Sequence, residues 1–221
     1  MKNMKSIKSQ QSGFTLVEIA IVLVIIGLLL GGILKGQELI NSAKVKSFAQ
    51  DYRTIQTALY GYQDRFKALP GDHAAVVTAL PGPPAAAPAT SPAGVQGNGQ
   101  INGVWDSANG TDESCLVWQH LRMAGFLAGP TAVSCAAGAD YLQKNADGGR
   151  IGISSTTQIA GMTGSFFICS SGILGKFARQ LDTQLDDGTT TTGSVRVALV
   201  SAPTVAMVPA DGDSTIVCLA F

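Results

Sequence analysis

The feature that most constrains this chain is an unbroken apolar run from Phe14 to Leu34, which reads FTLVEIAIVLVIIGLLLGGIL. Glu18 is the only ionisable side chain in the run. A helix rises about 1.5 Å per residue, so the run would span roughly 30 Å, the thickness of the hydrocarbon core of a bilayer. A helix that is apolar on every side does not suit the surface of a soluble domain. We therefore expect residues 14–34 to span a membrane.

The residues before this run favour one orientation and leave three interpretations. Lys2, Lys5 and Lys8 precede it without any acidic residue, which predicts a cytoplasmic N-terminus and an exported body. A secretory signal peptide would have a shorter apolar core with a small-residue cleavage site after it, and this run is too long and has no such site. An uncleaved anchor fits the hydropathy but leaves Glu18 unexplained, because a carboxylate inside a bilayer costs about 2.5–3.5 kcal/mol.

The third interpretation puts the cleavage site before the apolar run. The segment Ser12-Gly13-Phe14-Thr15-Leu16-Val17-Glu18 resembles the prepilin signal of type IV pilins and type II secretion pseudopilins. The resemblance extends to about residue 50. It implies that a prepilin peptidase cuts between Gly13 and Phe14, that the new amino group of Phe14 is methylated, and that the apolar helix stays on the protein.

Within this resemblance, Glu18 has a proposed partner. Cleavage would create an α-amino group on Phe14, and the Glu18 carboxylate of a neighbouring subunit would pair with it and set the axial register of a filament. The alternative is an interfacial carboxylate that reaches water near the start of the helix. The Gly13-Phe14 context favours the register role.

The helix is expected to continue beyond the membrane. Apolar residues recur at spacings of four and three, as on one face of an amphipathic helix: Phe48, Tyr52, Ile55, Leu59, Tyr62 and Phe66. No proline occurs from Phe14 to Ala68, which predicts a single helix of about 50 residues. Many pilins carry a proline where this chain has Lys35, so any bending on assembly would have to use the nearby Gly31, Gly32 and Gly36.

We expect four regions: a leader (1–13), a transmembrane and filament-core helix (14–34), its amphipathic continuation (35–66) and a globular head (67–221). The predicted helices of the head cover 73–80, capped by Asp72, 113–127 and 175–185. The predicted strands cover 151–154, 165–170, 194–201 and 214–221. Residues 81–103 are rich in Pro, Ala and Gly and predict an irregular surface loop. A long helix packed against an antiparallel sheet with short helices is an α+β, pilin-like fold.

Four cysteines, Cys115, Cys135, Cys169 and Cys218, predict two disulfides in an exported body, with three possible pairings. Cys169 and Cys218 lie in two strand-like runs that can be neighbours. This favours Cys169–Cys218 and Cys115–Cys135 over free thiols or a zinc site.

The sequence offers little support for catalysis or for a bound cofactor. His73 and His120 are the only histidines, and no G-x-S-x-G, P-loop or G-x-G-x-x-G motif is present. Five aspartates offer oxygen ligands of the kind that calcium prefers: Asp182, Asp186, Asp187, Asp211 and Asp213. The favoured interpretation is that all five lie in solvated turns and at helix ends. We expect no cofactor, no metal and no enzyme activity.

The function that these observations predict is that of a structural subunit of a type IV pilus. The expected partners are further copies of the chain in a helical homopolymer, the prepilin peptidase, an inner-membrane assembly platform and, before assembly, membrane lipid. Equal numbers of basic and acidic residues, 15 of each, do not indicate nucleic-acid binding. The expected location is the inner membrane and then an extracellular pilus. A type II secretion pseudopilin in a periplasmic pseudopilus, a minor pilin, and a membrane-anchored periplasmic enzyme or binding protein are the alternatives.

Overall fold

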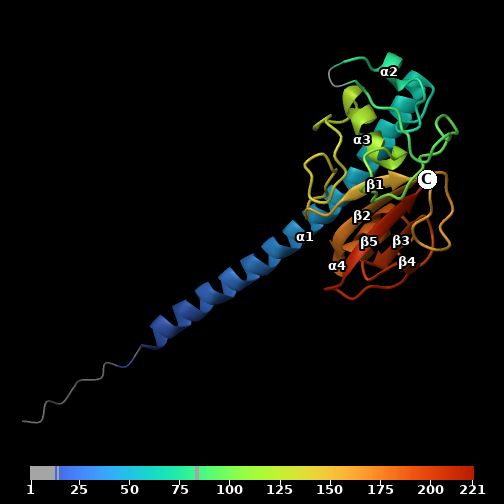
Figure 1. The fold of residues 1–221 in the computed structure, drawn as a ribbon. Coiled ribbons are helices and arrows are strands. Elements are labelled where there is room, and N and C mark those ends of the chain that lie inside the picture. Colours follow the sequence, from blue (N-terminus) through green and yellow to red (C-terminus); the bar gives the residue numbers. More distant parts are fainter. Residues whose placement is uncertain (1–12, 14, 83–84) are drawn as a thin grey trace, which may run out of the picture. The chain divides into compact units, whose positions relative to one another are not determined.

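The computed structural model describes residues 13, 15–82 and 85–221. Its elements in chain order are α1 (Leu16–Phe66), α2 (Val76–Ala79), α3 (Glu113–Met123), β1 (Ile151–Ser154), β2 (Phe167–Leu174), α4 (Gly175–Leu185), β3 (Val195–Leu199), β4 (Ala202–Ala206) and β5 (Ser214–Ala220) (Figure 1). The predicted α+β, pilin-like architecture is confirmed.

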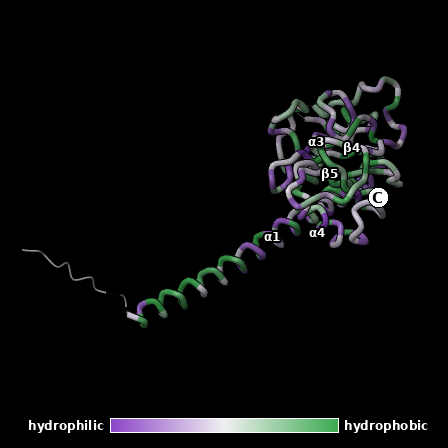
Figure 2. Tube along the Cα trace, turned by 90° about the horizontal axis from the view of Figure 1, so that it is seen from below, coloured by the Kyte–Doolittle hydropathy of each residue, from purple (hydrophilic) through white to green (hydrophobic). Residues whose placement is uncertain are grey.

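The chain divides into two compact units, Met1–Ser42 and Ala43–Phe221, with the division inside α1. In the first unit, the described residues are helical from Leu16 and continue through Gly31, Gly32 and Gly36 without a break. Figure 2 shows this part of α1 mostly in the green of hydrophobic residues, with hydrophilic residues at its start and toward its end. Every residue from Leu16 to Leu34 is exposed, and each large hydrophobic residue among them keeps at least 45% of its surface exposed.

The second unit is built on a five-stranded antiparallel sheet in the order β1-β2-β5-β3-β4. Strands β2 and β5 are central, and Cys169 lies directly opposite Cys218 in their register. Side chains of successive strand residues point to opposite faces, and both faces of this sheet are buried. Ile168 and Val217 therefore belong to one apolar core, whereas Phe167 and Ile216 belong to another.

The larger core contains the end of α1. The predicted apolar stripe is confirmed, because Phe48, Tyr52, Ile55, Leu59 and Tyr62 each keep 2% or less of their surface exposed. The hydroxyl of Tyr52 donates to the carbonyl oxygen of Val217 in β5 at 2.7 Å. This α1 segment thus supplies the centre of the hydrophobic core of the second unit.

The smaller core covers the other face of the sheet and was not predicted. Trp105, Ile159 and Met162 come from loops and pack with strand residues of β2, β3 and β5. A sheet with one face in solvent has strands in which apolar and polar residues alternate. The strand residues Phe167-Ile168-Cys169 do not alternate in this way, which is consistent with burial of both faces.

Two of the predicted strands had wrong limits, and the strand predicted from residue 165 begins at Phe167. β2 runs past the predicted end at residue 170, because a bulge between Ser171 and Ile173 interrupts the pairing with β5, which then resumes opposite Thr215. The predicted 194–201 strand ends at Leu199, and a fifth strand, β4, follows it. β4 contains Pro203 and lies at the sheet edge, where proline can be tolerated but weakens the sequence signal.

Two predicted helices were too long, and Asp72 has another role. α3 ends at Met123 because Gly125, at φ 81°, adopts the left-handed conformation that terminates a helix. α2 covers only residues 76–79, and its N-cap is Ala75. Asp72 instead accepts hydrogen bonds from the backbone N–H groups of the 97–99 loop.

The described part of the stretch 81–103 contains no helix, and its only strand-like feature is a bridge from Ser91 to Asp112. It is, however, not entirely at the surface. Ala86, Ala89 and Ile101 are buried, so three apolar side chains anchor this segment in the second unit.

Candidate functional site

The N-terminal segment combines accessibility, apolar character and a single charge. Gly13 is exposed, and a Cβ built on it would have no neighbour within 4 Å. Phe14 and the leader lysines lie outside the described residues. In the described part of the chain, α1 is the one helix long and apolar enough to cross a membrane, and the most hydrophobic stretch of it lies near the N-terminus.

Glu18 begins the helix through a reciprocal contact with Thr15. The backbone N–H and the hydroxyl of Thr15 both donate to Glu18 Oε2, at 2.8 and 2.7 Å. In return the Glu18 N–H donates to Thr15 Oγ1 at 3.3 Å. This arrangement is a capping box, which satisfies N–H groups that a helix start leaves without partners.

Thr15 is therefore a functional residue that sequence reasoning missed. The signal was available, because Thr15 and Glu18 stand in the T-x-x-E spacing that typifies a capping box before an apolar run. A carboxylate offers about four acceptor positions, so the contact with Thr15 leaves acceptor capacity on Glu18 for a cationic partner.

The four cysteines form two disulfides in the second unit. Cys115 is bonded to Cys135, with their Cα atoms 6.1 Å apart, and Cys169 is bonded to Cys218, with their Cα atoms 4.1 Å apart. This is the pairing that the sequence favoured. The first disulfide ties α3 to the loop that follows it, and the second links the two central strands.

The five candidate aspartates separate into two groups at opposite ends of α4. Asp211 and Asp213 lie beside its first residues, where their carbonyl oxygens accept from Lys176 N at 3.3 Å and Gly175 N at 2.9 Å. The Asp211 carboxylate also pairs with Arg179. These two residues serve a helix start and a turn, as the favoured interpretation predicted.

The other group gathers at the last turn of α4 and directly after it. Asp182, Asp186 and Asp187 each offer a carboxylate oxygen, and these three oxygens all lie within 4.8 Å of one another. Asp182 is completely buried. Burial, followed by the charges of Asp187 and Asp186, raises the pKa of Asp182 to about 6.

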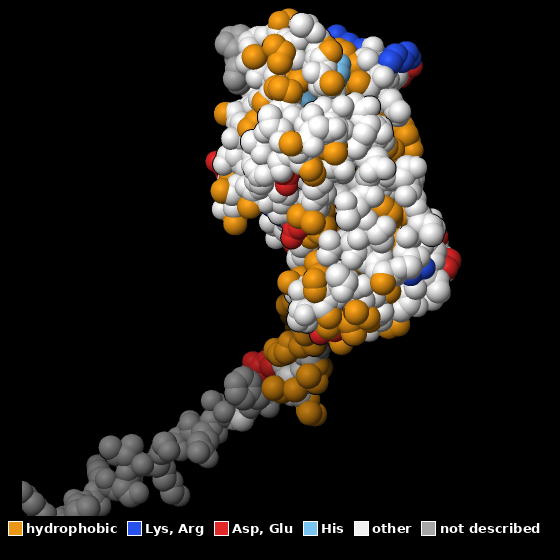
Figure 3. Space-filling model, turned by 45° about the vertical axis from the view of Figure 1, so that its right-hand side comes forward, with side chains coloured by type: hydrophobic (Ala, Val, Ile, Leu, Met, Phe, Trp, Pro, Cys, Tyr) orange, Lys and Arg blue, Asp and Glu red, His pale blue; other side chains and the backbone are white. Residues whose placement is uncertain are grey.

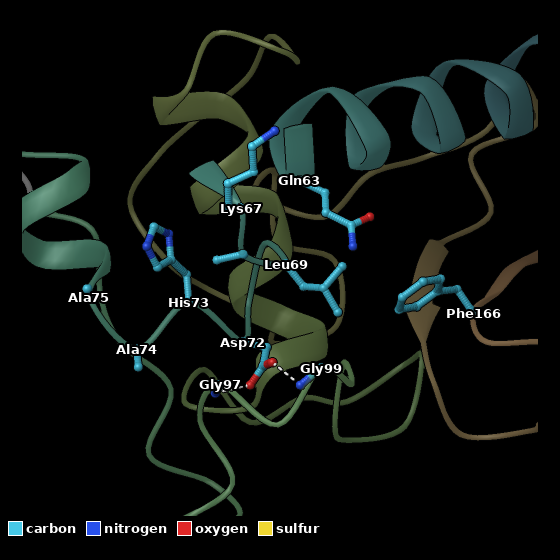
Figure 4. Close-up of a pocket in the computed structure, with 11 residues that line it drawn as sticks. Gln63, Lys67, Leu69, Asp72, His73, Ala74, Ala75, Gly97, Gly99 and Phe166 are labelled. Atoms are coloured by element: carbon cyan, nitrogen blue, oxygen red, sulfur yellow. Dashed lines mark hydrogen bonds between the residues drawn. The ribbon is translucent and has the colours of Figure 1, made fainter. Parts of the chain in front are cut away.

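A cavity of about 390 Å³ lies in the second unit between the end of α1 and the 97–99 loop (Figure 4). The ionisable groups that line it already have partners. Asp72 accepts from Gly99 N at 2.7 Å, Lys67 pairs with Asp64 at 2.8 Å, and His73 Nδ1 lies 2.8 Å from the Tyr62 hydroxyl. Lys67 points away from Asp72 in this view. These contacts are structural and form no acid–base pair.

His120 is a core residue. It is fully buried, and its Nδ1 accepts from Gly71 N while Nε2 donates to Ala87 O, both at 2.8 Å. Burial lowers the pKa of His120 to about 4. The imidazole is therefore neutral near pH 7 and joins three segments of chain.

Glu113 is a second residue that sequence reasoning missed. It is completely buried in the first turn of α3, and its Oε2 accepts from the backbone and side-chain nitrogens of Asn102 at 2.7 and 2.9 Å. Burial raises the pKa of Glu113 above its ordinary value, and the hydrogen bonds from Asn102 offset only part of this rise. Together with Asp72, Glu113 holds the glycine-rich loop over residues 97–102. Buried carboxylates have no signature in sequence spacing.

The charge distribution on the surface of the second unit bears on nucleic-acid binding. On the face drawn in Figure 3, charged side chains are few and scattered among polar and apolar ones. A continuous basic surface, the usual electrostatic footprint of a nucleic-acid binder, is not seen on this face.

Comparison with protein families matches residues 8–34 to the prokaryotic N-terminal methylation motif, which is the prepilin-type signal of type IV pilins and pseudopilins. Comparison with curated proteins and with solved structures finds no match for the chain. The motif spans the end of the leader, the expected cleavage site and the whole apolar run, and it implies processing by a prepilin peptidase.

Proposed function

We propose that this chain, which carries the prepilin-type signal of type IV pilins and pseudopilins, is a non-catalytic structural subunit of a type IV pilus. The observation that carries the proposal is the exposed apolar helix behind that signal. Between Leu16 and Leu34, the side chains other than Glu18 are apolar or glycine and are exposed. Such a surface is stable only in lipid or against other apolar helices.

The proposed mechanism follows from the two environments open to this helix. The precursor is stored in the inner membrane with its leader in the cytoplasm. Removal of residues 1–13 by the peptidase leaves the helix attached to the second unit. Extraction by an assembly platform then moves the helix from lipid into a bundle of identical helices. A head-to-tail contact repeated with rotation and rise produces an open helical filament.

Glu18 is proposed to set the register within that bundle. A carboxylate at this depth is unfavourable without a cationic partner, and cleavage creates one in the α-amino group of Phe14 on a neighbouring subunit. The capping box orients Glu18 by its contact with Thr15. Glu18 favours a subunit within the shaft over one at the tip, and the filament is then extracellular.

Mass spectrometry of the membrane-extracted protein tests the processing step. In the native host, or in cells that also produce a prepilin peptidase, the mature chain should begin at Phe14 and carry one added methyl group. Replacing Gly13 with a bulky residue should leave residues 1–13 in place. An intact chain from the unaltered sequence would refute the proposal and favour a membrane-anchored periplasmic protein.

The role of Glu18 is tested by Glu18→Ala with Glu38→Ala as the matched control. Glu38 lies on the same helix, is exposed and pairs with Lys35 at 2.6 Å. We expect Glu18→Ala to insert and be cleaved normally but to yield at least ten-fold fewer sheared filaments in electron micrographs, because the unpaired amino group would remain in the bundle. Glu38→Ala should yield normal filaments. Normal filaments from Glu18→Ala would remove the register role.

The same micrographs distinguish a pilus from a pseudopilus. Long surface fibres that contain this chain as their main component support the pilus subunit. Short periplasmic assemblies would instead support a type II secretion pseudopilin, and fibres that contain only traces of the chain would support a minor pilin.

A further inference from the structure

The acidic cluster at the end of α4 is unlike the other buried carboxyl groups of the second unit. Asp182 is 0% exposed, and neither of its carboxylate oxygens has a hydrogen-bond partner among the described residues. Asp72 and Glu113 are also buried, but Asp72 accepts three backbone N–H groups and Glu113 accepts two bonds from Asn102. A buried carboxylate without a donor or a cation is strongly unfavourable, so Asp182 lacks a partner.

The surroundings of Asp182 make the need for positive charge greater. The charges that act on it are those of Asp186 and Asp187, which are also negative. All three residues lie at the C-terminal end of α4, where the helix carbonyl groups already carry partial negative charge. Carboxylates are normally favoured at the other end of a helix. A bound cation would offset both the repulsion among the three carboxylates and the partial negative charge of the helix carbonyl groups.

The loop after α4 holds the two outer carboxylates toward Asp182. Asp186 Oδ2 accepts from Val195 N at 2.8 Å, and Asp187 Oδ1 accepts from Thr189 N at 2.7 Å. Gly193, at φ 72°, allows the close approach of Asp186, because a Cβ at position 193 would overlap the Asp186 carboxylate. Both carboxylates keep lone pairs for a further ligand.

We propose that Asp182, Asp186 and Asp187 bind a calcium ion. Their ligand oxygens lie within 4.8 Å of one another, so a single point can lie within about 2.8 Å of all three, and shifts of a few tenths of an ångström bring it into the calcium–oxygen range of about 2.3–2.6 Å. Magnesium requires shorter bonds in a near-ideal octahedron. The flexible coordination of calcium allows water or backbone carbonyl groups to complete the shell. The ion would join the last turn of α4 to the first residues of the loop after it, where Asp186 also accepts from Val195 N at the start of β3.

This site does not depend on the proposed filament function, and its test uses the full chain in a non-ionic detergent. Titration with calcium chloride in a calorimeter should give one site per chain with a Kd of about 10⁻³ M or tighter. Magnesium chloride should bind at least ten-fold more weakly. At 100 times Kd, calcium should raise Tm by roughly 5 °C or more.

Asp182→Asn keeps the shape of the side chain and removes its charge, so the variant should fold. In EDTA it should be at least as stable as the unaltered chain, because a buried like-charge repulsion is relieved. Its calcium affinity should fall at least ten-fold, and its Tm should not respond to calcium. Asp140→Asn, which alters an exposed aspartate in the loop before β1, should leave both calcium responses unchanged.

Four outcomes would overturn the proposal. The first is the absence of calcium binding by the unaltered chain at ten millimolar calcium. The second is equal affinity in Asp182→Asn, and the third is equal affinity for magnesium. A stability loss of Asp182→Asn in EDTA would also count against it, since that result would mean that the carboxylate is satisfied without an ion.

Discussion

At the scale of single residues, the second unit is organised by buried polar groups with defined partners. Asp72 and Glu113 hold the glycine-rich loop, and His120 joins the segments around Gly71 and Ala87. Each group satisfies backbone atoms that an irregular loop would otherwise leave buried without partners. These contacts explain how a segment with little regular structure is ordered.

The buried imidazole predicts a specific pH dependence of stability. His120 has a folded-state pKa of about 4, against a value near 6.5 in the unfolded chain. As pH falls from 6.5 to about 4, the unfolded chain takes up a proton that the folded chain does not, so the folded state loses stability. The loss due to this group is on the order of 3 kcal/mol.

A comparison of the unaltered chain with His120→Gln isolates this effect, since other titrating groups cancel in the difference. The destabilisation caused by His120→Gln, measured by urea unfolding, should be largest near pH 7 and should shrink as pH falls toward 4. If the difference in unfolding free energy between the two chains stayed constant over this range, the pKa of His120 would be the same in the folded and unfolded states, which would contradict the prediction.

At the scale of elements, the two central strands connect the two cores. On one side of β5, the carbonyl oxygen of Val217 accepts a hydrogen bond from the hydroxyl of Tyr52 in α1. On the other side, Cys218 is joined to Cys169 of β2 within the smaller core. The helix packing and the disulfide thus act on opposite faces of the same pair of strands.

The disulfides should contribute unequally to stability. Cys169–Cys218 spans a sequence separation of 49 and Cys115–Cys135 one of 20. The chain-entropy relation gives about 4 kcal/mol for the longer loop and about 3 kcal/mol for the shorter one. Urea unfolding of Cys169→Ala/Cys218→Ala should therefore show the larger loss. The Cys115→Ala/Cys135→Ala chain is the matched control, because all four cysteines are almost fully buried. The reverse order would contradict this expectation.

At the scale of the whole molecule, the chain combines two units with opposite requirements. Residues 16–34 have apolar side chains that no other described part of the chain covers, whereas the unit from Ala43 has its own core. That unit begins inside the range 35–66, which the sequence assigned to the continuation of the helix. Its core includes Phe48, Tyr52 and Leu59 of α1, so the head needs the second part of the helix.

Truncation tests this division. A secreted fragment of residues 43–221 should be a soluble monomer with both disulfides and cooperative thermal unfolding, as measured by size-exclusion chromatography and circular dichroism. A fragment of residues 67–221 should aggregate or fail to unfold cooperatively, because it lacks the central apolar stripe. Cooperative folding of the shorter fragment would show that the stripe is dispensable.

The sequence by itself determined the features that depend on local composition and spacing. The apolar run, the prepilin-type signal, the amphipathic stripe, the fold class and α4 were all predicted, since each follows from hydropathy or periodicity along a continuous segment. Strand β1 was predicted with its observed limits for the same reason.

Apart from the two disulfides, whose pairing the sequence favoured, only the tertiary structure decided which distant residues meet. It separated Asp182, Asp186 and Asp187 from Asp211 and Asp213, because the two groups lie at opposite ends of the eleven-residue helix α4. Three further features appear only in the tertiary structure: Asp72 binds the 97–99 loop and does not cap a helix, the second face of the sheet is buried, and Glu113 is buried. Burial and partnership arise from contacts between segments far apart in the chain, and spacing along the sequence carries no record of them.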